Sequence, residues 1–517
     1  DAHYNRGIAL YDMKRWEDAV ASFDAAIAAD PNHGSAWHNR GIALHDLGRV
    51  DDALASYDRA QLVNPIAGES AGYAFNIVAY LCDWPERERR GADLVRRALE
   101  GQRVEPFNMI AAGDNPQAQY EAARKFVAYG VPAQSPLPRK PRPPSDKIRL
   151  CYLSGDFHDH PVAQLTAPLF EHHDRDRFEL IALSSGPNDG SSMHARMQKA
   201  FERFYDVVPA SNAQVAQIIQ DLNVDIAVDL SGFTKGARIG ALAYRPAPLA
   251  VNMLGFPGTT GASYIDYIIA DPHLISPEMQ GFFTEKPVYL PDTYMPNHRE
   301  RLIGTTPSRA EVGLPPQGFV FCCFNGSFKF AREVFEIWLR LLHTVPGSVL
   351  WFNFNYDRAA ENLRHFAQSQ GIAAERLVFS KTRLSAEDHL ARLQHADVFL
   401  DTRPYNAHAT AADILWAGVP VITCPGKAFA ARVAGSLVSA AGLPEFVCSS
   451  LADYEALALR CARDAEFLRA AKDKLVLGRA TSALFDVERY TRNLENAYVT
   501  MWERLQKGMP PERISIV

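Results

Sequence analysis

The sequence predicts an α-helical repeat domain followed by two α/β units, each built on a parallel, doubly wound sheet. Three observations predict this fold class. A short segment near the N-terminus recurs after 34 residues, prolines crowd the stretch 131–147, and strand-like and helix-like segments then alternate to the C-terminus. Regular alternation of strands and helices favours parallel sheets with helices on both faces.

The first element is the repeat. The segment 5–10 (NRGIAL) returns at 39–44, and the same shift carries Phe23 to Tyr57. The period and the residue types match the tetratricopeptide repeat, in which two helices form one unit. Small residues such as Gly7 let the paired helices approach closely, and Phe23 and Tyr57 fill the space between repeats. This pattern predicts a tetratricopeptide superhelix.

The array is expected to cover 1–130. Two repeats rarely bury enough surface to stand alone, so 66–128 is interpreted as degenerate repeats that complete the array. Pro31 and its counterpart Pro65 are expected to end the second helix of each repeat. Because the sequence begins inside a repeat and without Met, we expect the natural protein to carry more repeats. The prolines of 131–147 predict a stiff, extended linker.

Two α/β units follow, at 148–310 and 311–517. The first is expected to contain strands at 148–153, 178–183, 225–230, 250–254 and 267–270. The second is expected to contain strands at 319–324, 348–354, 376–379, 398–401 and 420–423. A long amphipathic helix at 487–507 has the apolar spacing to pack across both units. Two such units in series predict a cleft, with ligands bound at the carboxyl ends of the strands.

Composition excludes several functional classes. The net charge of −6 gives no reason to expect a nucleic-acid partner. No apolar run is long enough to span a bilayer, so no membrane partner is expected. Seven scattered cysteines match no zinc motif and indicate reduced thiols in a cytoplasmic protein. No other cluster of metal ligands stands out, so we expect neither a catalytic metal nor a cofactor.

Polar residues follow several of the expected strands. His160 follows the first strand of the first unit, and Lys329 follows the first strand of the second. His408, Thr410 and Asp413 follow the strand at 398–401, where a helix begins. A cleft between the two units could bring these three places together.

Each position has a functional and an ordinary interpretation. The helix start at 408–413 suits a diphosphate, because free N–H groups and the helix dipole both favour negative charge; it could equally be a capped helix with Thr410 as the cap. Lys329 could neutralise that diphosphate or be a solvated lysine. His160 could be a general base, and His158 is no less eligible. The glycine-rich loop 254–261 borders the cleft.

Seven motifs together resemble the O-linked N-acetylglucosamine transferases and their bacterial homologues. The resemblance covers essentially the whole chain and is carried by GDFxxHP at 155–161, GFTKGAR at 232–238, RPAP at 245–248, GFPGT at 255–259, CFN at 323–325, SVLW at 348–351 and LWAG at 415–418. It implies the two-lobed GT-B architecture, an inverting mechanism and no metal.

The resemblance also implies roles for individual residues. His160 matches a histidine of the acceptor site proposed as the base, and Lys329 matches an essential lysine on the donor diphosphate. In the loop 254–261, the residues expected to line the acceptor site or the cleft are Gly255, Pro257 and Thr259. On the nucleotide side, the matching phosphate, ribose and uracil positions are His408, Thr410, Asp413, His389 and Arg392.

The chain departs from the family pattern at three positions. Ala409 stands where a threonine is expected, Gly326 where a glutamine is expected, and Ala386 where a lysine is expected. We expect transfer of N-acetylglucosamine from its uridine diphosphate (UDP) donor, UDP-GlcNAc, to Ser or Thr of proteins held by the repeats. The alternatives are a related transferase with another donor, O-fucosyl or glucosyl, and a catalytically weak scaffold that binds UDP.

Overall fold

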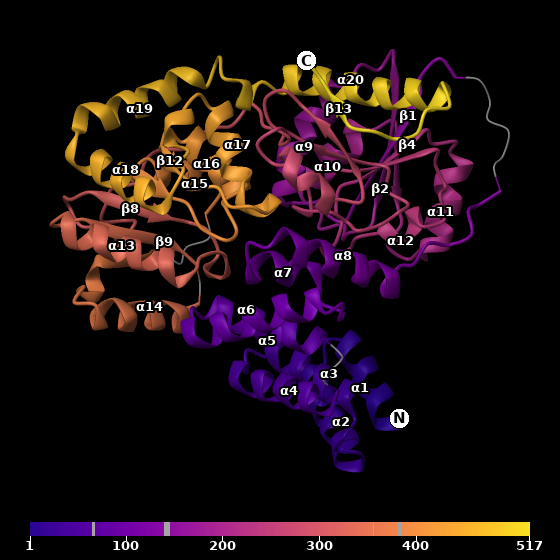
Figure 1. The fold of residues 1–517 in the computed structure, drawn as a ribbon, viewed down its shortest axis with the longest axis horizontal. Helices are drawn as coiled ribbons and strands as arrows, with labels where there is room; N and C mark the ends of the chain where they lie inside the picture. Colours follow the sequence, from indigo (N-terminus) through magenta and orange to yellow (C-terminus); the bar gives the residue numbers. More distant parts are fainter. Residues whose placement is uncertain (65–67, 139–144, 355, 381–383) are drawn as a thin grey trace.

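The computed structural model describes residues 1–64, 68–138, 145–354, 356–380 and 384–517. A helical array lies beneath two α/β lobes that stand side by side (Figure 1). The predicted fold class, helical repeats followed by two parallel-sheet lobes, is confirmed. Pro65 and the part of the predicted linker at 139–144 lie outside the described residues.

The array is a succession of antiparallel helices. Its bounds are α1 Ala2–Asp12, α2 Trp16–Ala29, α3 Gly34–Asp46, α4 Val50–Val63, α5 Glu69–Tyr80, α6 Trp84–Leu99, α7 Pro106–Ala112 and α8 Pro116–Gly130. A Cβ on Gly7 would lie 2.5 Å from the ring of Phe23, and one on Gly41 would lie 2.6 Å from Tyr57. The small residues of the repeat are therefore required where each aromatic ring fills the gap between helices.

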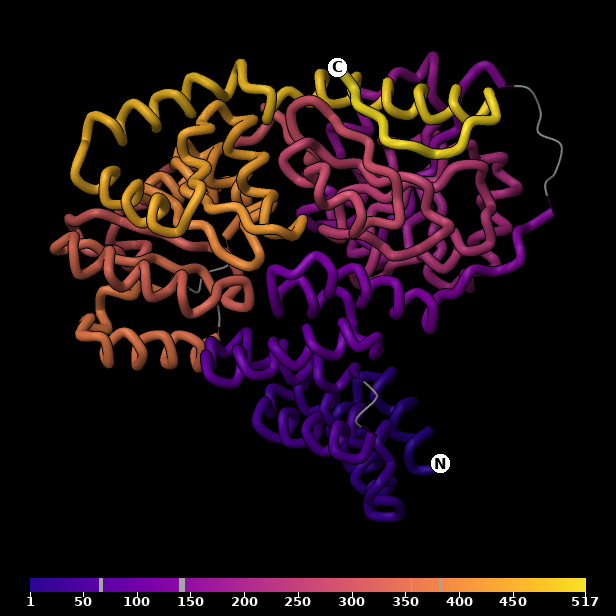
Figure 2. Tube along the Cα trace, viewed as in Figure 1, coloured from indigo at the N-terminus to yellow at the C-terminus, as the bar shows by residue number. Residues whose placement is uncertain are grey.

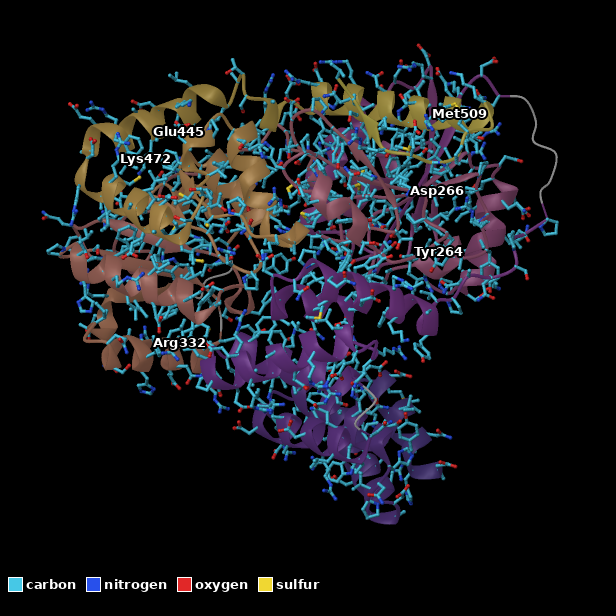
Figure 3. All side chains as sticks on the ribbon, viewed as in Figure 1. Tyr264, Asp266, Arg332, Glu445, Lys472 and Met509 are labelled. Atoms are coloured by element: carbon cyan, nitrogen blue, oxygen red, sulfur yellow. The ribbon has the colours of Figure 1, made fainter. Side chains whose placement is uncertain are left out.

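The array is joined to both lobes by side-chain contacts. The buried Arg87 of α6 donates to the carbonyl of Phe330 at 2.6 Å, and Ser327 donates to the carbonyl of Tyr80 at 2.6 Å. On the other side, the hydroxyl of Tyr264 (Figure 3) donates to the carbonyl of Val131 at 2.9 Å. The repeats therefore contact both lobes, next to the segment that carries Lys329.

The first lobe is built on an eight-stranded parallel sheet in the order β13-β7-β6-β5-β4-β1-β2-β3. Its strands are β1 Ile148–Ser154, β2 Phe178–Ser184, β3 Arg203–Asp206, β4 Ile226–Asp229, β5 Leu249–Asn252, β6 Tyr267–Ala270, β7 Lys286–Tyr289 and β13 Ile514–Ser515. Along β1, Leu150 and Tyr152 enter one hydrophobic core and Cys151 and Leu153 enter another. Both faces of the sheet are therefore covered, as in other parallel sheets.

Helices pack on this sheet and on the five-stranded parallel sheet of the second lobe, whose order is β10-β9-β8-β11-β12. The first lobe has α9 Pro161–His172, α10 Ser192–Ala200, α11 Asn212–Asp221 and α12 Ile239–Leu242. The strands of the second sheet are β8 Val320–Cys323, β9 Val349–Asn353, β10 Leu377–Ser380, β11 Val398–Leu400 and β12 Val421–Ile422. Its helices are α13 Arg332–Thr344, α14 Asp357–Ser369, α15 Ala386–Leu393, α16 Ala409–Trp416, α17 Val433–Ala440, α18 Leu451–Arg463 and α19 Ala465–Gly478.

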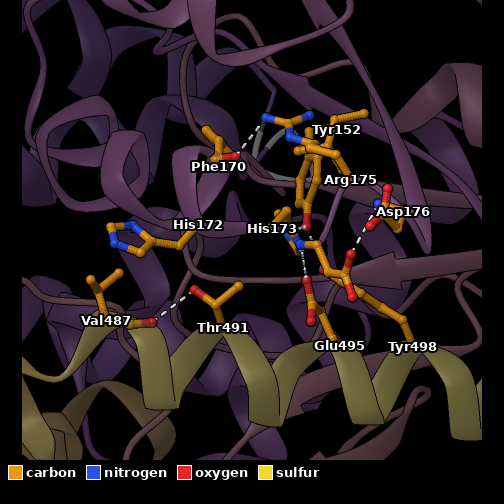
Figure 4. Close-up of polar contacts among 12 residues, drawn as sticks. Tyr152, Phe170, His172, His173, Arg175, Asp176, Val487, Thr491, Glu495 and Tyr498 are labelled. Carbon is orange, nitrogen blue, oxygen red and sulfur yellow. Dashed lines mark hydrogen bonds and ion pairs between the residues drawn. The ribbon is translucent and has the colours of Figure 1, made fainter.

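The C-terminal segment returns to the first lobe. Helix α20, Val487–Gln506, packs mainly against α9, and β13 pairs in parallel with β7 (Figure 2). Glu495 of α20 accepts from the backbone N–H of Asp174 at 2.7 Å. Its carboxylate also lies 2.9 Å from the ring of His173 (Figure 4). The sequence predicted a helix packing across both units; the structure places it on the first, because its buried polar partners lie there.

All seven cysteines are free and buried, as the sequence indicated. Among the described helices, none combines the length and the apolar character that crossing a bilayer requires. The cytoplasmic location stays a prediction.

Candidate donor and acceptor sites

Two of the predicted site residues, His160 and Lys329, lie where the strand order of each sheet reverses. In the first sheet β1 lies between β4 and β2, and His160 follows β1. In the second sheet β8 lies between β9 and β11; Lys329 follows β8, and His408 follows β11. Helices leave such a reversal point on opposite faces of the sheet, which opens a crevice at the carboxyl ends of the strands.

Lys329 lies at the end of a short 3-10 helix, Ser327–Lys329. Its Nζ donates to the carbonyl of Asn406 at 3.1 Å and lies 4.0 Å from the ring centroid of Tyr405. Burial lowers the pKa of Lys329 to about 8, and the nearby carboxylate of Asp401 only partly offsets that shift. The ammonium is thus held by weak neutral partners, and a bound anion would stabilise it strongly.

Asp401, at the end of β11, organises the loop that leads to α16. Its carboxylate accepts from the backbone N–H of Ala407 at 2.7 Å and from the hydroxyl of Thr423 at 2.6 Å. Burial raises the pKa of Asp401 to about 6. Asp401 therefore shapes the loop 402–408 from beneath and provides a counter-charge for Lys329.

His408 is the residue immediately before α16. Its Nε2 lies 3.2 Å from the carbonyl of Ala430, and burial lowers its pKa well below the usual value. A neutral ring in this contact carries its proton on Nε2. The N–H groups of Ala411 and Ala412 donate to the carbonyl of His408. The two N–H groups before them, of Ala409 and Thr410, have no partner within the helix, so they and the Thr410 hydroxyl are the donors available to an anion. Thr410 itself is inside the helix and does not cap it.

The remaining nucleotide-side residues lie on α15 and α16, which pack together. Asp413 of α16 forms an ion pair with Arg301. His389 and Arg392 of α15 contact each other at 2.8 Å, and the Arg392 guanidinium lies 5.2 Å from the ring centroid of Phe324. Burial lowers the pKa of His389 to about 4, so this ring is neutral at physiological pH. The rings of His389 and Phe324 lie close together, with their centroids 6.0 Å apart.

On the predicted acceptor side, His160 caps the start of α9. Its Nδ1 accepts from the backbone N–H of Val162 at 3.3 Å and lies 3.7 Å from the carboxylate of Asp156. Burial lowers the pKa of His160 from its usual value, and Asp156 opposes that shift. The side chain is 39% exposed. The other eligible histidine, His158, lies 3.7 Å from Asp189 instead.

The loop after β5 brings Gly255, Pro257 and Thr259 to the junction of the three units. A Cβ on Gly255 would lie 2.1 Å from the carbonyl of Leu230, so only glycine fits there. The buried hydroxyl of Thr259 donates to Glu285 at 2.6 Å. Contact of this loop with an acceptor stays a prediction, and Thr259 would contribute by holding the loop in shape.

This junction is closely packed. A cavity of about 20 Å³, room for roughly one water, is enclosed by residues of α7 and α8, of the loop 256–259 and of the segment 428–429. Next to it, Ile110, Phe256 and Tyr405 form one apolar cluster. The array, the first lobe and the second lobe therefore meet beside Lys329.

Sequence reasoning missed three residues of the site. Arg301 lies between the two lobes in a stretch without regular structure, so no periodicity marks it. Tyr405, beneath the ammonium of Lys329, lies in a loop where aromatic residues carry no local signal. Asp401 could have been found, because a carboxylate at the end of a predicted parallel strand points to the ligand edge of the sheet.

Comparisons with known proteins agree with this arrangement. Residues 133–306 and 299–494 match the model of glycosyl transferase family 41, and residues 4–71 match a tetratricopeptide repeat model. A solved structure of a Thermobaculum terrenum O-GlcNAc transferase, a lysine-to-methionine mutant, superposes with a TM-score of 0.78. The two chains are 26% identical, and the superposition covers 98% of each.

Two curated relatives match over most of this chain. A probable UDP-N-acetylglucosamine–peptide N-acetylglucosaminyltransferase of Arabidopsis thaliana is 34% identical over 84% of this chain and 47% of its own length. A UDP-N-acetylglucosamine–peptide N-acetylglucosaminyltransferase of Caenorhabditis elegans is 28% identical over 71% of this chain and 42% of its own length. The chain thus spans less than half the length of these relatives. The family model covers most of the chain, which therefore belongs to glycosyl transferase family 41.

Proposed function

We propose that this protein transfers N-acetylglucosamine from UDP-GlcNAc to Ser or Thr hydroxyls of proteins, with inversion at the sugar and without a metal. Membership of glycosyl transferase family 41 and the similarity to peptide N-acetylglucosaminyltransferases support the reaction class. The observation that carries the proposal is the position of Lys329, a partly buried ammonium without a salt-bridge partner among the described residues, beside the N-terminus of α16.

Departure of UDP from the sugar leaves negative charge on the diphosphate. Lys329 and the N–H groups of α16 are oriented before the substrate arrives, so they stabilise that charge without reorganisation. They supply the positive charge that a divalent cation supplies in metal-dependent transferases, which is the basis for proposing a metal-independent reaction. Asp413, His389 and Arg392 would hold the ribose and the uracil.

In the proposed step, the acceptor oxygen forms a bond to the anomeric carbon as the bond from that carbon to the diphosphate oxygen breaks. Attack from the face opposite UDP inverts the configuration. The hydroxyl proton passes to His160, whose lowered pKa keeps the ring neutral and able to accept it. The acceptor would be a segment of a protein held by the repeat array, which contacts both lobes at the junction.

A second candidate is a related transferase for another sugar, or a scaffold with weak activity. One specific observation favours this second candidate. A Cβ on Gly326, where the family has glutamine, would lie 2.8 Å from the ring of Phe328. That ring packs on Tyr80 of the array and on Tyr405. The space beside Lys329 is therefore filled differently from the family pattern, which could change the choice of sugar.

Calorimetric titration with UDP, UDP-GlcNAc, UDP-glucose and GDP-fucose in chelator-containing buffer tests the donor. We expect selective binding of UDP and UDP-GlcNAc, followed by transfer of the sugar to a Ser/Thr peptide library detected by mass. Preference for GDP-fucose or UDP-glucose would favour the second transferase. Binding of UDP without turnover on any acceptor would favour the scaffold, and binding of no nucleotide would refute the proposal.

A further inference from the structure

Asp114 of the helical array lies in the short loop between α7 and α8. Gly113 ends α7 with extended backbone, and Asn115 caps α8 by accepting from the backbone N–H of Ala118 at 3.0 Å. The loop is therefore fixed at both ends by helices that pack together. Its one carboxylate projects away from the array and toward the second lobe, which would bind the donor and is called the donor lobe below.

The carboxylate is bound by the backbone of the donor lobe. Both of its oxygens accept from the N–H of Lys427 at 2.8 Å, and one also accepts from the N–H of Ala428 at 2.7 Å. Arg403 adds a side-chain contact at 3.3 Å. A Cβ on Gly426 would lie 2.2 Å from the carboxylate, so only glycine allows this approach. Consecutive N–H groups around one anion form a strong, charge-assisted contact.

The segment held by Asp114 also supports the donor site. The carbonyl of Ala430 accepts from the backbone N–H of Asn406 at 2.9 Å and lies 3.2 Å from the ring of His408. The carbonyl of Asn406 in turn accepts from Nζ of Lys329. Hydrogen bonds and short backbone links therefore run from Asp114 through 427–430 to the two residues that face the diphosphate.

We propose that Asp114 is a positioning residue through which the helical array holds the donor-diphosphate site in its binding geometry. Asp114 touches neither substrate; it fixes the segment 426–431, and that segment fixes Asn406 and His408. This inference rests on the proposed UDP site. It makes the repeats a part of the donor site's support in addition to their proposed role in holding the acceptor.

The test compares two variants, each of which removes one ion pair between the array and the donor lobe. Asp114→Asn keeps the shape of the side chain but places an NH₂ group against backbone N–H groups. Asp51→Asn is the matched control, because Asp51 also pairs with the donor lobe, through Arg358 at 2.8 Å, but on an exposed surface. We expect the Kd for UDP to rise about tenfold in Asp114→Asn and to stay unchanged in Asp51→Asn.

The steady-state readout is the KM for the donor against kcat. Asp114→Asn should raise the donor KM and leave the KM for the acceptor peptide unchanged, whereas a general loss of stability would reduce the active fraction without this split. Equal UDP affinity in wild type, Asp114→Asn and Asp51→Asn would overturn the inference. A wild-type protein that binds no UDP would instead refute the proposed function.

Hydrogen exchange of the wild-type protein covers the case in which Asp114→Asn does not fold. Coupling between two sites is reciprocal, so UDP should slow exchange both in 426–431 and in 113–118 of the array. Protection confined to the donor lobe would show that the array is not coupled to the donor site and would overturn the inference.

Discussion

The proposed donor and acceptor sites hold their key side chains in different ways. Lys329 and His408 contact fixed backbone carbonyls from neighbouring loops, and burial lowers the pKa of each. His160 is 39% exposed and is held within its own loop, by Val162 and Asp156. Under the proposed function, the electrostatic part of catalysis would rest on the more rigidly held donor-side residues, and the acceptor-side histidine would be the less constrained of the two.

The strongest test of this comparison is removal of the donor-side charge. Lys329→Met should lower kcat about 1,000-fold, since the departing diphosphate loses its principal cation. The native-state pKa of Lys329 lies below its unfolded value, so the protonated form costs stability at pH 7. The variant should therefore melt no lower than wild type in differential scanning calorimetry. Full turnover in this variant would end the assigned role of Lys329.

Removal of the acceptor-side histidine should lower kcat less than removal of Lys329. His160→Gln should lower kcat about 100-fold through loss of the proton acceptor, while the UDP affinity measured by calorimetry stays at the wild-type value. The pH profile identifies the group: in wild type the rate should fall below the lowered pKa of His160, and this acidic limb should vanish in the variant. His158→Gln is the control and should retain both the rate and the limb.

The two sides should also differ at alkaline pH. Because the pKa of Lys329 is about 8, the ammonium is lost as the pH rises through that value. The kcat/KM for the donor should then fall about tenfold for each pH unit above 8. Lys329→Arg, with a guanidinium that keeps its charge, should move this limb to higher pH. A profile that stays flat to pH 10 in wild type would mean that the charge of Lys329 does not limit donor capture.

A smaller effect is expected at the ribose position. Asp413→Asn should weaken UDP binding about tenfold if its carboxylate accepts from the ribose hydroxyls. Since Asp413 also pairs with Arg301, Arg301→Gln is the matched control for loss of that ion pair. Calorimetry should show a weaker effect in Arg301→Gln. Equal losses in the two variants would assign the effect to the ion pair.

The smallest expected change is a gain in affinity for UDP. Ala409 lies in the first turn of α16, where the family pattern has threonine. Ala409→Thr should lower the Kd for UDP about threefold by adding one hydroxyl near the diphosphate. Ala412→Thr, on the same helix but at a buried position, is the control for effects of threonine on the helix itself. An unchanged Kd in Ala409→Thr would place residue 409 away from the phosphates.

Much of this architecture could be predicted from the sequence because it depends on local patterns. The repeat period, the apolar strands and the polar residues after β1, β8 and β11 are all visible in short windows. The edge strand β3 was missed because its side chains are partly exposed and charged, as Arg203 and Asp206 illustrate. Arg301 and Asp114 were missed for another reason. Their roles depend on contacts between residues more than 100 positions apart, which no local window contains.

The return of α20 and β13 to the first lobe means that the chain crosses between the lobes twice, once near 290–318 and again near 479–486. Two interdomain connections restrict the relative rotation of two lobes more than one connection does. Rotation of one lobe about the other would therefore strain both connections at once, whereas a single connection would leave that rotation free. Deleting 487–517 would remove the anchor of the second connection and, with it, an edge strand from the sheet of the first lobe.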